Sequence, residues 1–131
     1  MARLGWLLLR EGRRGRAGRV ETVLGRELAR YPTRPSALAR RARFAPTPDT
    51  PFAIEPGSPA AFGHRLWTDA TGTMPGAAVP RDAFCGHGVR EPLLVVIPSL
   101  ERVLVRAGSG PDLLPDFRRE LVARITAALL A

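Results

Sequence analysis

The feature that most constrains the fold is a run of five apolar residues, Leu93–Ile97, of which three are β-branched. Such a run is typical of a strand that is buried on both faces. Pro98–Glu101 follows and is short enough for a tight connection, so we expect Arg102–Arg106 to return as an antiparallel partner. Two strands do not form a stable sheet alone, so other elements must extend and cover this one.

A helix is predicted at each end of the chain. Met1–Glu11 is dense in Leu and is apolar on several faces, so it needs cover on more than one side, and Gly12 can end it in the left-handed conformation. The second helix lies within 111–131, where Asp112 or Asp116 can cap it and Pro115 fits its first turn. Its apolar stripe comprises Leu114, Phe117, Leu121, Ile125 and Leu129.

The segments between these elements are more varied. Arg13–Arg19 is predicted as a basic, glycine-rich loop, and Val20–Tyr31 as a helix because Val20, Val23, Leu24 and Leu28 recur at helical spacing. Phe62–Thr68 alternates enough to be a strand, with Trp67 and Arg65 on one face and His64 on the other. We therefore predict one partial α+β domain with three antiparallel strands. Its parts are helices in 1–31, a Pro-rich loop in 32–61, strands in 62–110 and a helix in 111–131.

The charge of the chain gives little information about its partners. The formal net charge is +8, but all 20 basic residues are Arg, and the 131 residues include no Lys, Asn or Gln. This bias indicates GC-rich coding, which raises Arg without selection for phosphate contacts, so we do not expect a nucleic-acid partner. The alternative is a small Arg-rich binding module that uses the loops around Arg13–Arg19 and Arg40–Arg43.

Cysteine, histidine and the apolar runs define what else is expected. Cys85 is the only cysteine, so no intrachain disulfide forms, and with two scattered histidines it does not make a zinc site. We predict no metal and no cofactor. The apolar run Leu4–Leu9 is too short for a membrane span and lacks a signal-peptide cleavage site, which leaves a cytoplasmic location as the default expectation.

Several patches of the sequence resemble one family in order and spacing. Asp82–Phe84 reads Asp-Ala-Phe, Val96–Leu100 reads Val-Ile-Pro-Ser-Leu, and Val103–Arg106 reads Val-Leu-Val-Arg. Together with Met1–Gly12 and the strand Phe62–Asp69, they resemble the C-terminal part of the class C β-lactamase-related, penicillin-binding-protein-like serine hydrolases. The resemblance covers about two thirds of the chain. It implies part of a three-layer sandwich beside an active-site cleft, and in the parent enzyme the hydrolysis of a small amide or ester through an acyl-serine.

The chain lacks two of the three motifs that this family uses. Without Lys there is no Ser-x-x-Lys, and Tyr31, the only tyrosine, is followed by Pro and Thr rather than by x-Asn. We therefore expect the chain to be inactive by itself. The expected explanation is a start at an internal Met or a truncated gene. An alternative is one half of a split hydrolase that folds with a separate upstream polypeptide.

The third family motif, Lys-Thr-Gly or His-x-Gly, corresponds to Gly86-His87-Gly88. Gly86 stands where the family has Lys or His, so the charge that anchors substrate is in doubt, and Arg90 is a candidate replacement. The resemblance thus implies five substrate-binding residues and no catalytic residue, namely Gly86, His87, Gly88, Trp67 and Arg90. The competing interpretations are an ordinary turn histidine at position 87 and a nucleophilic Cys85 beside it.

Overall fold

The part of the chain that can be described consists of several segments with gaps between them. The computed structural model describes residues 1–16, 18–34, 36–37, 41, 66–68, 79–87, 92–107 and 115–130. Within these residues the chain forms helices and antiparallel strands, which confirms the predicted α+β class. Most of the predicted Pro-rich loop, together with His64, Arg65 and Asp112, lies outside the described residues.

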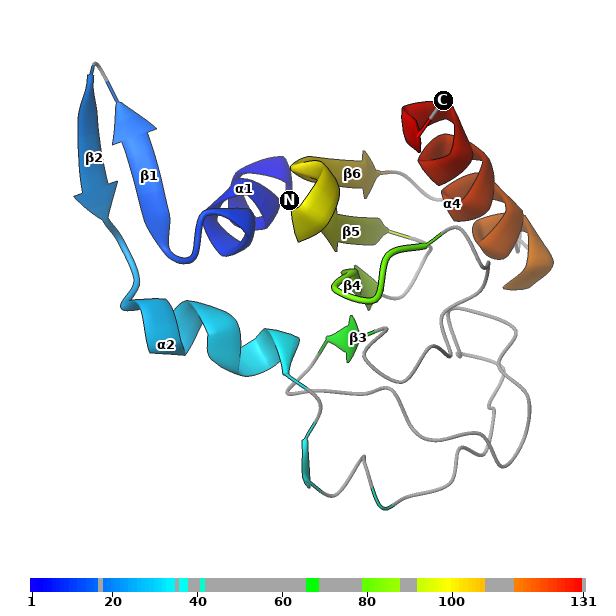
Figure 1. The fold of residues 1–131 in the computed structure, drawn as a ribbon, viewed down its shortest axis with the longest axis horizontal. Coiled ribbons are helices and arrows are strands. Elements are labelled where there is room, and N and C mark those ends of the chain that lie inside the picture. The colour runs from blue at the N-terminus through cyan, green and yellow to red at the C-terminus, as the bar shows by residue number, and fades with distance from the viewer. Residues whose placement is uncertain are drawn as a thin grey trace.

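The centre of the fold is a four-stranded antiparallel sheet whose strands follow one another in chain order (Figure 1). The strands are β3 (Trp67–Thr68), β4 (Phe84–His87), β5 (Leu93–Ile97) and β6 (Arg102–Arg106). All five residues of β5 are buried, so the prediction of a doubly covered strand is confirmed. The prediction of three strands was wrong, since β4 adds a fourth between β3 and β5.

A short turn connects β5 to β6 and is tied to the residues that lead into β4. Pro98–Leu100 forms a 3-10 turn, and Glu101 follows in the left-handed region with φ 50°. Asp82 holds this turn, because its carboxylate accepts hydrogen bonds from the Ser99 backbone N–H at 2.6 Å and from the Ser99 hydroxyl at 2.9 Å. The predicted β5–β6 hairpin is therefore confirmed, and residues 82 and 99 bring two distant parts of the sequence together.

Two helices cover opposite faces of this sheet (Figure 1). Helix α1 (Ala2–Leu9) packs Leu8 and Leu9 against a cluster on one face that comprises Phe84, Leu94, Val96, Leu66 and Val103. Helix α4 (Pro115–Leu130) contributes Val122 to the cluster on the other face, which comprises Val79, Ala83, Cys85, Leu93, Val95 and Ile97. The described residues thus form three layers, helix, sheet and helix.

Helix α4 presents a different side to the sheet than the apolar pattern predicts. Among residues 120–129 of this helix, Val122 and Thr126 are buried, and the Thr126 hydroxyl donates a hydrogen bond to the Val122 carbonyl oxygen at 2.8 Å. Leu121 and Ile125 are only half-buried, and Leu129 is exposed. At these three positions the predicted stripe is one residue out of register with the buried side, whereas Leu114 and the Phe117 side chain lie outside what the structure describes. A threonine that bonds its own helix backbone can occupy a buried position without an unsatisfied hydroxyl.

Two residues with positive φ end helix α1. The Gly12 N–H donates to the Leu7 carbonyl at 2.8 Å and the Glu11 N–H to the Leu8 carbonyl at 3.1 Å, a Schellman arrangement. Glu11 has φ 52° and Gly12 φ 87°. A Cβ atom on Gly12 would collide with the Leu24 carbonyl oxygen, so both the conformation and the close approach require glycine.

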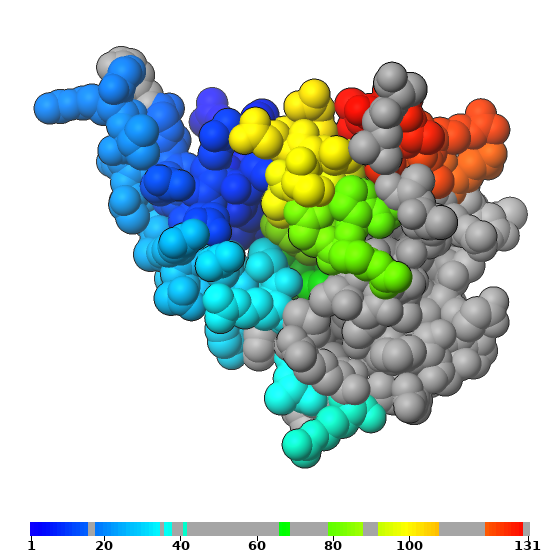
Figure 2. Space-filling model, viewed as in Figure 1, coloured from blue at the N-terminus to red at the C-terminus, as the bar shows by residue number. Residues whose placement is uncertain are grey.

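The segment after Gly12 is a β-hairpin and not the predicted loop and helix. Strands β1 (Arg13–Arg16) and β2 (Arg19–Thr22) pair antiparallel, and Gly18 in the turn has φ 76°, which the short turn demands. Of the predicted helix 20–31, two parts are helical. They are Arg26–Arg30, which form helix α2, and Tyr31, which begins the 3-10 turn Tyr31–Thr33. The space-filling view shows this hairpin standing out at the margin of the molecule (Figure 2).

Candidate functional site

Three of the five predicted site residues lie in described strands, and β4 is the element that organises them. Gly86 and His87 are the last two residues of β4, and Trp67 begins β3, directly opposite Cys85. All three are half-buried. Gly88 and Arg90 lie outside the described residues.

The pleat of the sheet divides these residues between its two faces. Cys85 belongs to the cluster under α4, and Trp67 packs against that cluster. Alternation along β4 places His87 on the same face as Cys85 and puts Gly86 on the opposite face. A Cβ atom on Gly86 would lie 3.3 Å from a Leu66 methyl group. The structure therefore brings Trp67 and His87 to one face, while Gly86 allows Leu66 to approach the other.

The position of β4 differs in part from what the resemblance implies. The family carries its third motif on an edge strand, but β4 lies between β3 and β5. The β3–β4 ladder pairs Thr68 with Phe84 and Trp67 with Cys85, and among the described residues it stops there. On its other side β4 pairs with β5, where Gly86 and His87 lie opposite Leu94 and Leu93. The histidine lies in a strand, so the interpretation as a turn residue was wrong.

Cys85 is not a nucleophile. Its side chain is completely buried, and burial raises the pKa of the thiol well above its ordinary value of 9.0. A thiol with a raised pKa stays protonated at neutral pH, and the thiolate is the reactive form. His87 lies two residues further along the same strand, and Cys85 itself is shielded from solvent. Cys85 acts as a small apolar core residue.

The Ser99 hydroxyl has a structural role. The Ser99 hydroxyl donates to Asp82 and fixes the β5–β6 turn, and no imidazole or amine is involved in that bond. Ser58 and Ser109 lie outside the described residues. The described part of the region around β4 therefore comprises the His87 imidazole, the Gly86 backbone and the Trp67 indole.

The described residues include neither a metal-binding cluster nor a membrane-spanning helix. No group of three or more His, Cys, Asp and Glu side chains there is arranged to hold a metal ion. None of the helices that the structure describes is long and apolar enough to cross a membrane.

The sequence analysis did not predict the concave surface that lies between α1 and the β1–β2 hairpin. It was missed because the hairpin was predicted as a loop and a helix, which leaves α1 without a facing wall. The sequence does carry a signal for the hairpin. Ala17-Gly18 is a two-residue turn candidate, and the β-branched Val20 and Thr22 alternate after it.

Comparison with known proteins adds no family assignment to this geometry. Neither a scan against protein-family models nor a search of curated proteins found a match to the chain.

Proposed function

We propose that this chain forms one wall of the substrate cleft in a β-lactamase-related serine hydrolase and contributes no nucleophile. The observation that carries the proposal is the structure around β4. Gly86 and His87, two of the three residues that resemble the third family motif, end strand β4, and alternation along this strand places His87 on the same face as Trp67. That arrangement gives a substrate one polar side chain beside an apolar wall.

The layering of the described residues also supports the proposal. The resemblance implies a three-layer sandwich, and α1 and α4 cover opposite faces of the sheet here. The patch Val96–Leu100 forms the end of β5 and its turn, and Asp82 of the Asp-Ala-Phe patch bonds to that turn. Two of the patches that carry the resemblance are thus joined in space by the hydrogen bonds between Ser99 and Asp82.

The chemistry of such a site divides between this chain and the segment that carries Ser-x-x-Lys. A serine hydroxyl on that segment attacks the carbonyl carbon of an ester or amide, a lysine beside it takes the proton, and the alcohol or amine leaves with that proton. Water then hydrolyses the acyl-serine. This chain binds and orients the substrate: the His87 imidazole donates or accepts one hydrogen bond, and Trp67 excludes water from one side.

Complementation tests this proposal. The chain is mixed with the N-terminal segment of a β-lactamase-related hydrolase that carries Ser-x-x-Lys and Tyr-x-Asn, and p-nitrophenyl ester hydrolysis is followed. We expect each polypeptide alone to be inactive and the mixture to be active. Hydrolysis by this chain alone, or no gain on mixing, would contradict the proposal.

A histidine pair provides the matched variants for this assay. His87→Ala removes one hydrogen bond to the substrate, and we expect the activity of the mixture to fall about tenfold. His64→Ala removes the other histidine of the chain, for which no substrate contact is proposed, and we expect a change of less than about twofold. Equal effects of the two variants would remove His87 from the site.

A further inference from the structure

Helix α1 is apolar on two sides, and only one of them is covered by the sheet. Gly5, Leu8 and Leu9 face the sheet, where a Cβ atom on Gly5 would come within 2.8 Å of a Leu94 methyl group. Leu4 and Trp6 lie on the other side and are 52% and 47% exposed. The sequence predicts that this helix needs cover on more than one side. Among the described residues, nothing covers the side that carries Leu4 and Trp6.

The hairpin turns this exposed side of α1 into a groove. Figure 1 shows β1 and β2 standing beside α1, away from the sheet. Val20 and Val23 line the groove from the hairpin, and they are 73% and 46% exposed. Together with Leu4, Trp6 and Leu7 of the helix they make an open concave surface with a volume of about 1110 Å³. Most of the exposed area that lines it is apolar.

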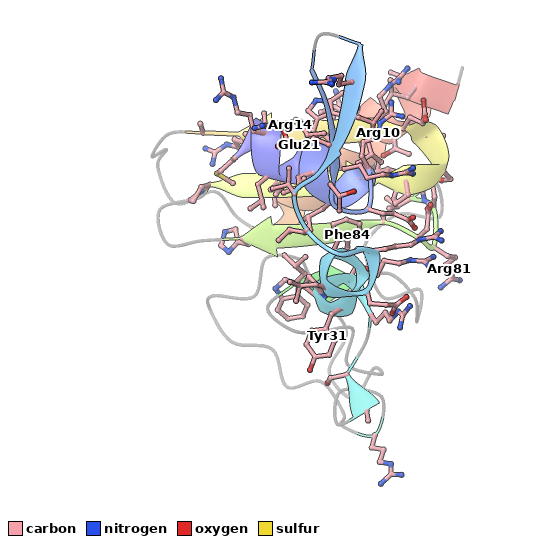
Figure 3. The ribbon with its side chains drawn as sticks, turned by 90° about the vertical axis from the view of Figure 1, so that its left-hand side faces the viewer. Arg10, Arg14, Glu21, Tyr31, Arg81 and Phe84 are labelled. Atoms are coloured by element: carbon pink, nitrogen blue, oxygen red, sulfur yellow. The ribbon has the colours of Figure 1, made fainter. Side chains whose placement is uncertain are left out.

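The rim of the groove is positively charged. Arg3, Arg10, Arg13 and Arg14 line it, and none of its described lining residues is acidic. The Arg10 guanidinium lies 5.7 Å above the centre of the Trp6 ring and 3.9 Å from the Glu101 carboxylate, and Arg14 contacts Glu21 on the neighbouring strand at 2.9 Å. Arg3 and Arg13 have no such carboxylate contact among the described residues and leave the rim with excess positive charge. Figure 3 shows Arg10 close to this hairpin and Arg14 and Glu21 on it. The surface combines an apolar floor with an excess of cations.

We propose that this groove binds an acidic amphipathic helix of a partner protein. The apolar face of such a helix would lie on Leu4, Trp6 and Val20, and its Glu or Asp residues would meet the arginine rim. A helix of about 10 Å diameter and about 5.4 Å pitch occupies roughly 420 Å³ per turn. The groove therefore has room for about two turns, which is enough for anchors at i, i+3, i+4 and i+7.

Other occupants fit the surface less well. A second copy of this chain carries the same arginine rim and a net charge of +8, so it meets charge repulsion. Single-stranded nucleic acid is held by successive aromatic side chains, and Trp6 is the one aromatic lining residue. A membrane surface suits a convex apolar face better than a groove between a helix and a hairpin.

Peptide binding by the full chain tests the proposal, by fluorescence anisotropy of a labelled synthetic peptide of about 14 residues with Leu at i, i+3, i+4 and i+7. One version carries Glu at the remaining charged positions and the other carries Lys. We expect the Glu peptide to bind at least about tenfold more tightly than the Lys peptide at low salt, and this preference to shrink as salt is added.

Two exposed apolar positions give a matched pair of variants. Val20→Asp puts a negative charge into the groove, whereas Leu28→Asp puts one at a residue of α2 that is 63% exposed and does not line the groove. We expect Val20→Asp to weaken binding of the Glu peptide about tenfold or more, and Leu28→Asp less than about twofold. Because both side chains are exposed, both variants should keep the far-UV circular dichroism spectrum of the parent chain. Arg3→Glu provides a second groove variant.

Several results would overturn the proposal. They are equal binding of the Glu and Lys peptides, equal effects of Val20→Asp and Leu28→Asp, and a groove-dependent interaction with phosphatidylserine vesicles, single-stranded DNA or a second copy in place of the peptide. This site does not rest on the hydrolase proposal. Peptide binding and ester hydrolysis are measured separately, so either can fail without the other.

Discussion

Glu11 shows how one residue can join three elements. Its backbone is in the left-handed region, φ 52°, where a residue with a Cβ is normally disfavoured. Its carboxylate contacts the Nε of Arg26 at 2.6 Å and the Nε of Arg30 at 3.1 Å. It therefore links the end of α1 and the start of the hairpin to α2. The Arg26 hydrogen bond and the nearby guanidinium charges hold the pKa of this carboxyl below its ordinary value of 4.5.

This lowered pKa predicts how stability depends on pH. Because the folded-state pKa is depressed, Glu11 stabilises the fold above pH 4.5, and this contribution disappears as the pH falls through the folded-state pKa. We expect Glu11→Gln to lower the urea midpoint at pH 7 and to have a smaller effect at pH 2.5. The measurement is urea unfolding of both proteins by circular dichroism at each pH.

Glu27→Gln is the control for this experiment. The Glu27 side chain is 77% exposed and lies 3.4 Å from the Arg34 guanidinium, so its ion pair is surrounded by solvent. We expect the midpoint to be almost unchanged at both pH values. If Glu11→Gln behaves like Glu27→Gln, the ion pairs of Glu11 do not stabilise the junction.

At the level of elements, the strands with strong local patterns were predicted and the hairpin β1–β2 was missed. Leu93–Ile97 needs cover on both faces whatever surrounds it, and its return strand follows from a short connection. In Val20–Tyr31, by contrast, the apolar residues fit a helical spacing. The cross-strand pairing of Arg14 with Glu21 and the positive φ at Gly18 decide for strands there. Pairing partners of this kind are not visible in a periodicity.

The contact between Asp82 and the β5–β6 turn gives a prediction at this scale. Asp82→Ala removes both hydrogen bonds to Ser99, and we expect the free energy of unfolding to fall by about 1 kcal/mol. Ser99→Ala keeps the backbone N–H bond, so its cost should be about half as large. Urea unfolding measures both. A larger loss for Ser99→Ala than for Asp82→Ala would contradict the proposed role of the carboxylate.

For the whole molecule, the sequence predicted which elements exist better than how they face one another. The helices at the two ends were expected, and they lie on opposite faces of the sheet. The buried side of α4 is centred on Val122 and Thr126, because Thr126 satisfies its hydroxyl within the helix and can therefore be buried. A pattern of apolar residues alone does not anticipate a buried threonine.

The candidate site was predictable to the same extent. The strand that carries Trp67 was predicted, whereas β4, the neighbouring strand that carries Gly86 and His87, was not among the three predicted strands. The resemblance did not indicate which face of the sheet each of them occupies, since that depends on the register of β4 against β5. The groove beside α1 is formed in part by the hairpin. Because 20–31 was predicted as a helix, the groove was not predicted.

We propose that this chain contributes a cleft wall and no nucleophile. Labelling with a serine-reactive probe, followed by measurement of the intact mass of both polypeptides, tests this proposal. The chain is mixed with the Ser-x-x-Lys segment of a β-lactamase-related hydrolase and treated with a fluorophosphonate, which phosphonylates activated serine hydroxyls with loss of fluoride. Our account predicts an adduct on the partner only, formed faster when this chain is present. An adduct on this chain, or labelling of the partner that does not depend on it, would contradict the account.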